Sequence, residues 1–179
     1  MARLAHGLVL LVLFATIAEC HLCLFWPPQR GELDGYNKVE ADDCGLQTGP
    51  CGGRATGPIE GHTMAVGANN TITFQKNQNH YNATEPGNFS FAIAYRSNPQ
   101  QQHDFIDLGS IPDTDTPALT MYTVPVELPN PILRHAVLQV AYNTNNSPGT
   151  FYQCADINLR GFPCGCDPNL VDDEGDYYL

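Results

Sequence analysis

Residue 21 is a histidine, and it stands where a secretory signal peptide is expected to be cut. Cleavage after Cys20 would make His21 the first residue of the mature chain, with a free α-amine and an imidazole on the same carbon. These two nitrogens can close a small chelate ring on a metal ion. Copper(II) favours tetragonal nitrogen and oxygen ligation, and imidazole suits it. The start of the mature chain therefore predicts a copper site.

The first twenty residues have the order of a secretory signal. Arg3 supplies a positive charge, residues 7–17 form an apolar run, and Ala18 and Cys20 place small residues before the cut. The run is shorter than the ~20 residues that a membrane span needs. We therefore expect a secreted, extracellular protein without a membrane span. An uncleaved anchor is the alternative, and a cut after His21 would remove the proposed ligand.

A second histidine, His80, is the best candidate to share the metal with His21. It lies between two expected strands, residues 71–74 and 89–95, and therefore on a loop at one end of the fold. Binding residues concentrate on loops held by a rigid scaffold. If the N-terminus lies at the same end, three nitrogens can meet one ion in a T shape. His62 is the alternative second ligand, while a surface or structural role is expected for His103 and His135.

The rest of the chain is expected to form an all-β fold, an antiparallel β-sandwich with long loops. Side chains alternate in character along Phe89–Tyr95 and Arg134–Tyr142, which is typical of strands. Six or so such segments are separated by turn residues. We expect a signal peptide over 1–20, one β-sandwich domain over 21–160 and an acidic, cysteine-containing tail over 161–179. The other expected strands are 22–26, 71–74, 119–128 and 150–159.

Six cysteines remain after removal of Cys20, which predicts up to three disulfides with the pairing left open. The Gly- and Pro-rich segment 29–61 is expected to be a long loop pinned by disulfides. Cys164 and Cys166 are too close to pair easily with each other and are expected to staple the tail to the body. A cysteine-based zinc site is the rival interpretation, but the spacing lacks two CxxC pairs.

Charge and sequons point to the same extracellular setting. The formal net charge of −11 argues against binding nucleic acid or an anionic membrane surface. Asn-X-Ser/Thr sites begin at Asn69, Asn82 and Asn88, and a fourth at Asn145 is disfavoured by the proline after it. These sites predict a glycoprotein. A glycan on Asn82 would stand two residues from His80 and obstruct docking on a flat polymer.

Several segments resemble histidine-brace copper proteins. Residues 21–31, HLCLFWPPQRG, look like the opening of lytic polysaccharide monooxygenases (LPMOs). Residues 50–53, PCGG, and residues 151–157, FYQCADI, are similar to segments of the LPMO-like copper acquisition factors first recognised in fungi. The resemblance covers most of residues 21–160 and leaves out the tail after Gly161.

The resemblance implies an immunoglobulin-like β-sandwich that holds one Cu²⁺ ion. His21 and His80 would form the brace, and Asp156 would supply a carboxylate ligand. Asp104 and Asp107 are the alternative carboxylates. An anionic oxygen ligand stabilises Cu(II) and competes with oxygen for its position, so a filled site favours carrying the ion over turnover.

The sequence thus predicts a monomeric copper-binding protein for copper acquisition or homeostasis without redox turnover. A cell-surface copper transporter is the expected receiving partner. The first alternative is a copper-dependent polysaccharide monooxygenase that uses the same brace. The second is a metal-free extracellular interaction module.

Overall fold

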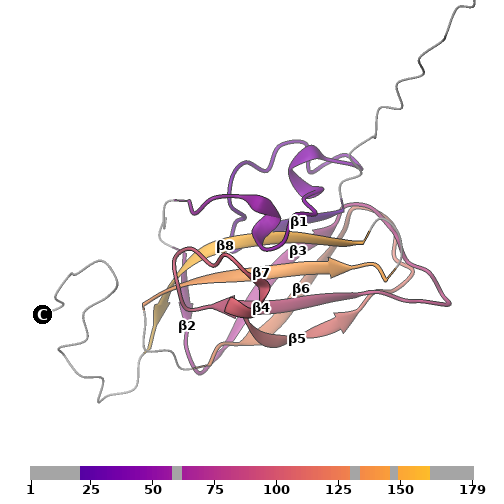
Figure 1. The fold of residues 1–179 in the computed structure, drawn as a ribbon. Coiled ribbons are helices and arrows are strands. Elements are labelled where there is room, and N and C mark those ends of the chain that lie inside the picture. Colours follow the sequence, from indigo (N-terminus) through magenta and orange to yellow (C-terminus); the bar gives the residue numbers. More distant parts are fainter. Residues whose placement is uncertain (1–20, 58–61, 130–133, 146–148, 162–179) are drawn as a thin grey trace, which may run out of the picture.

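Two β-sheets face each other in the computed structural model, which describes residues 21–57, 62–129, 134–145 and 149–161. The predicted signal peptide and, apart from Gly161, the predicted tail with Cys164 and Cys166 therefore lie outside the described residues. One sheet has the strand order β1-β3-β6, and the other has the order β2-β8-β7-β4-β5. Figure 1 shows the two layers and the long indigo-to-purple segment that lies over β1 and β8. The strands are β1 Leu22–Trp26, β2 Thr63–Ala65, β3 Asn69–Lys76, β4 Asn88–Ala94, β5 Ile106–Pro112, β6 Thr120–Glu127, β7 His135–Asn143 and β8 Thr150–Arg160.

The strands pair in an antiparallel way, with one exception. β2 runs parallel to β8, and Thr63 faces Asn158. The expected antiparallel β-sandwich is confirmed, and among the described strands only the three-residue β2 pairs in parallel. β6 is an edge strand of the three-stranded sheet, which explains how it accommodates Pro125.

Alternation along the strands builds the core between the two sheets. Phe89, Phe91 and Ile93 of β4 are buried there, as the period-two pattern predicted. On β7 the alternate residues Leu138, Val140 and Tyr142 are fully buried in the same core. A strand that buries every second residue presents its remaining side chains to the opposite face of the sheet.

Two disulfides pin the long segment between β1 and β2 onto the sandwich. Cys23 of β1 bonds to Cys44 in the 3₁₀ turn Asp42–Cys44. Cys51 in the 3₁₀ turn Cys51–Gly53 bonds to Cys154 of β8. The predicted disulfide-pinned loop is confirmed: one bond ties it to β1 and the other ties it to β8.

Candidate metal centre

His21 and His80 lie at the same end of the sandwich because β1 and β3 are antiparallel neighbours. Leu22 faces Lys76 in the register, so the start of β1 lies beside the end of β3. The backbone N–H of Asn77 donates to the carbonyl of His21 at 3.0 Å. His80 follows three residues later, and its backbone N–H donates to the Tyr142 hydroxyl at 3.2 Å.

The two imidazole rings contact each other directly. Nε2 of His80 lies 2.7 Å from Nδ1 and 3.1 Å from Nε2 of His21. The ring centroids are 3.9 Å apart and the planes are nearly perpendicular, at 84°. A hydrogen bond between two imidazoles requires one nitrogen to donate and the other to accept. Two potential metal donors, 59 residues apart in sequence, are therefore brought together by the fold.

An aromatic ring covers this histidine pair from β8. The Phe151 ring lies 4.0 Å from the His21 ring and 6.1 Å from the His80 ring, centroid to centroid. Phe151 is fully buried and belongs to the core between the sheets. One side of the histidine pair is therefore closed by hydrocarbon.

A chain of buried polar groups from β7, β3 and the residue after β5 holds the His80 backbone. The Tyr142 hydroxyl, which accepts from the His80 backbone, donates to Oδ2 of Asp113 at 2.7 Å. Nζ of Lys76 donates to Oδ1 of Asp113 at 2.6 Å, and both side chains are fully buried. Burial, followed by the neighbouring Asp113 carboxylate, raises the pKa of Tyr142 well above its usual range. The phenol therefore stays protonated and can act as the donor to Asp113.

Asp156 does not join the two histidines. Its carboxylate accepts two bonds from Arg30, from Nη2 at 2.7 Å and from Nε at 2.9 Å, and a third from the Gly57 backbone at 3.0 Å. Asp156 lies five residues further along β8 than Phe151, roughly 17 Å at the usual strand rise. The Asp156 carboxylate is thus held by Arg30 and Gly57, and its role as a copper ligand stays a prediction.

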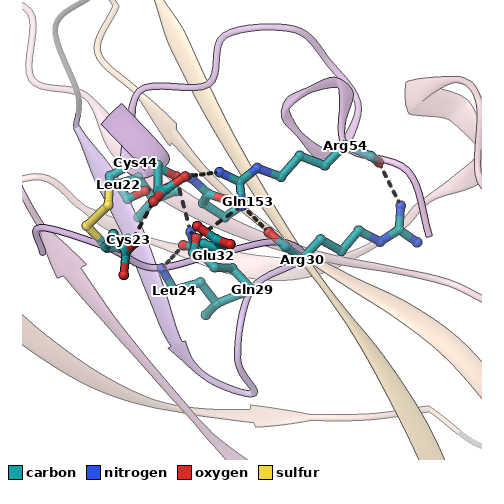
Figure 2. A network of polar contacts seen from close by, with 11 residues as sticks. Leu22, Cys23, Leu24, Gln29, Arg30, Glu32, Cys44, Arg54 and Gln153 are labelled. Carbon is teal, nitrogen blue, oxygen red and sulfur yellow. Dashed lines mark hydrogen bonds and ion pairs between the residues drawn. A yellow bond between two sulfur atoms is a disulfide. The ribbon is translucent and has the colours of Figure 1, made fainter. Parts of the chain in front are cut away.

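The Arg30 guanidinium reaches several groups besides Asp156. It donates to the carbonyls of Arg54 and Ser97, each at 3.2 Å. Arg54 in turn pairs with Asp43 at 2.6 Å, and Figure 2 shows the two arginine side chains running in opposite directions. This network ties the long loop to β8, so the Arg30–Asp156 pair has a structural place in the fold.

The alternative ligands also lie apart from the histidine pair. Asp104 pairs with Arg96 at 2.8 Å, and Asp107 accepts from the backbone of Gly109. His62 packs its ring against Trp26 at the far end of β1, 5.5 Å between centroids. Among the described residues, no group of three or more His, Cys, Asp or Glu side chains is placed to hold a metal ion.

A family comparison decides what kind of protein carries this histidine pair. The family model described as copper acquisition factor BIM1-like matches residues 19–166. The chain belongs to this family. The match spans both histidines, both described disulfides and the Arg30–Asp156 pair. No curated protein matches the chain at a significant level.

The solved structures similar to this copper acquisition factor family member include LPMOs. An AA10 LPMO from Streptomyces lividans has a TM-score of 0.56 at 13% identity, covering 77% of this chain and 99% of its own. An LPMO from Jonesia denitrificans has a TM-score of 0.52 at 13% identity, covering 78% and 100%. The LPMO catalytic domain Lmo2467 from Listeria monocytogenes has a TM-score of 0.50 at 13% identity, covering 79% and 100%. At these identities the likeness shows a shared fold.

Sequence analysis of this family member missed Phe151 and Tyr142 as parts of the site. In the sequence, each is visible only as a residue of an expected strand. Their positions on β8 and β7 place them at the end of the sheet where His80 lies.

None of the helices in the described ranges has the length and apolar character that a membrane crossing requires.

The histidine pair predicts a pH-dependent stability of the metal-free protein. Burial, followed by the charge of His80, lowers the pKa of His21 from 6.5 to about 3. As the pH falls, His21 is protonated in the unfolded chain before it is protonated in the folded protein. Its contribution to the free energy of unfolding is therefore fully present above about pH 6.5 and is lost as the pH falls toward 3. The slope is at most about 1.4 kcal/mol per pH unit.

Urea unfolding at pH 7 and pH 5 measures this effect. Between pH 7 and pH 5, the free energy of unfolding should fall by roughly 2 kcal/mol more in the wild-type protein than in His21→Gln, because the variant lacks the titrating ring. The variant serves as the control for carboxylates that also titrate in this range. Equal losses in the two proteins would contradict a neutral His21 in the folded state.

Proposed function

We propose that the chain, cut after Cys20, binds one copper(II) ion through the α-amine and ring of His21 and the ring of His80. The observation that carries the proposal is the 2.7 Å approach of His80 Nε2 to His21 Nδ1. Nδ1 is also the ring nitrogen that can close a six-membered chelate with the α-amine of the same residue. An all-nitrogen donor set of this kind suits copper(II).

The role that we propose is copper acquisition or delivery outside the cell, without redox turnover. Its main support is membership of the copper acquisition factor family. Asp156 stays out of the proposed donor set because Arg30 and Gly57 occupy its carboxylate. Without Asp156 as a ligand, the carrier role is not supported by a filled coordination sphere. Its support is the family membership. A cell-surface copper transporter is the expected recipient.

A polysaccharide monooxygenase is the second candidate. The fold shared with LPMOs and the Phe151 ring against the histidine pair favour it. An open site with few protein ligands is the arrangement that catalytic metals need, as closed and open zinc sites illustrate. Hydrogen peroxide production or oxidised oligosaccharides from chitin or cellulose, with a reductant present, would favour this candidate over the carrier.

Titration calorimetry and electron paramagnetic resonance on protein with a verified His21 N-terminus test the donor set. One copper(II) ion should bind, with nitrogen hyperfine structure in the spectrum. An alanine placed before His21, or His80→Gln, should weaken binding at least about 100-fold, which is about 2.7 kcal/mol. The matched control is His62→Gln, because His62 packs against Trp26 and not against His21. Unchanged affinity in the extended chain would sink the proposal.

A further inference from the structure

Gln153 has a buried side-chain oxygen without a hydrogen-bond partner. The residue is fully buried on β8, two positions after Phe151 and therefore on the same face of the strand. Its amide nitrogen Nε2 donates to the carbonyls of Leu22, at 3.1 Å, and Asp43, at 2.8 Å. Its oxygen Oε1 accepts from no group of the described chain. Buried polar atoms are almost always paired, so this one calls for a partner.

The orientation of the Gln153 amide is fixed by its neighbours. The amide oxygen and nitrogen look alike in shape, and their assignment rests on the hydrogen bonds around them. Turning the group over would place Oε1 against two carbonyl oxygens, which can only accept. The atom without a donor is therefore the oxygen, and the missing partner must be an N–H or O–H group.

The amide lies next to the first residue of the proposed mature chain. Leu22 and Asp43, which it holds, are the direct neighbours of His21 and Cys44. These two residues are themselves joined, because the backbone N–H of His21 donates to the carbonyl of Cys44 at 3.1 Å. Figure 2 shows Gln153 in the same network of polar contacts as Leu22 and Cys44. Gln153 thus contacts the sequence neighbours of both His21 and Cys44, the two residues that this backbone hydrogen bond joins.

Processing would create the donor that Gln153 lacks. In the uncut chain the His21 nitrogen is a peptide group with one N–H, and Cys44 accepts it. A primary amine that has given its lone pair to a metal carries two N–H groups, and the protonated free amine carries three. Once Cys44 accepts one, the mature amine keeps at least one donor for a neighbouring acceptor.

We propose that Oε1 of Gln153 accepts a hydrogen bond from the mature α-amine and so positions it for the metal. Cys44 and Gln153 would then hold the amine from two directions and direct its lone pair toward the site of the ion. Groups that orient metal ligands in this way affect metal affinity without touching the metal. The inference rests on the proposed function for its copper arm, but its first test needs no metal.

The first experiment compares metal-free proteins that begin at His21 with proteins that carry one alanine before it. Wild type, Gln153→Met and Gln29→Met are each made in both forms, and urea midpoints are measured. Gln29 is the matched control, because it also donates to the carbonyl of Asp43, at 3.1 Å, but its own oxygen is satisfied by the Leu24 N–H.

For wild type and for Gln29→Met, the chain that begins at His21 should have a higher urea midpoint than the chain with the extra alanine, by similar amounts in the two proteins. The rise should be smaller in Gln153→Met, which has no acceptor for the new N–H. An equal rise in all three proteins overturns the inference. Because no copper is present, this result is independent of whether the protein binds copper.

Copper affinity gives the second readout. In chains that begin at His21, Gln153→Met should bind copper(II) at least roughly tenfold more weakly than Gln29→Met. Equal affinities of the two variants would overturn the positioning role. Failure of the wild-type mature chain to bind copper would instead refute the proposed function, and the metal-free comparison would still decide the place of Gln153.

A crystal structure of the wild-type mature chain covers the case in which Gln153→Met does not fold. We expect Oε1 of Gln153 within about 3.2 Å of the His21 nitrogen, the usual limit for an N–H···O bond. A water molecule or another N–H group bound to Oε1, with the amine elsewhere, would overturn the inference.

Discussion

Replacing Asp156 with asparagine should lower the free energy of unfolding by about 3–5 kcal/mol and leave the copper(II) spectrum unchanged. The Arg30 and Asp156 side chains are only 2% and 6% exposed, and two hydrogen bonds join them. Without the carboxylate, a guanidinium stays buried without its counter-charge. The cost of breaking such a pair comes mainly from the charge that remains.

Urea unfolding and electron paramagnetic resonance on the same samples test both halves of this expectation. Asp43→Asn is the control, since its pair with Arg54 is about a fifth exposed on both sides. That variant should cost only about 1 kcal/mol or less. A changed copper hyperfine pattern in Asp156→Asn, together with an unchanged stability, would return Asp156 to the ligand set.

The strands with clear alternation could be predicted from sequence, and the short or interrupted ones could not. β1 has the predicted bounds, and β4 and β7 differ from the predicted ranges by one residue at either end. β2 has only three residues and gains its hydrogen bonds from β8, so it carries no period of its own. In β5, Gly109 interrupts the pattern, and the strand is a largely exposed edge. Local pattern therefore identifies strands that bury a face and misses those that depend on a neighbour.

The histidine pair and the Arg30–Asp156 pair differ in how far the sequence could foresee them. The sequence placed His80 on a loop between two expected strands and allowed it to meet His21 only on the condition that the N-terminus lies at the same end; the pairing of β1 with β3 meets that condition. The alternation of β8 placed Asp156 on the same face as Cys154, but it could not say which end of the strand meets the histidines. Nor could any local signal join Asp156 to a partner 126 residues away.

The second large effect is expected at Lys76, whose ammonium group is fully buried against Asp113. Lys76→Met should lower the free energy of unfolding by about 3–5 kcal/mol, because the Asp113 carboxylate then stays buried without its counter-charge. Without Lys76 to fix it in place, the Asp113 carboxylate would also hold the Tyr142 hydroxyl less firmly. Since that hydroxyl accepts from the His80 backbone, the loss should reach the proposed copper site.

Copper affinity separates this effect from a general loss of stability. Lys76→Met and Asp156→Asn should be similarly destabilised, yet only Lys76→Met should bind copper(II) clearly more weakly. Replacing both members, Lys76→Met with Asp113→Leu, should recover part of the lost stability, because no buried charge is left. It should not recover the affinity, because the Tyr142 hydroxyl still lacks its acceptor. If the double variant bound copper like wild type, the chain from Lys76 to His80 would have no part in holding the second histidine.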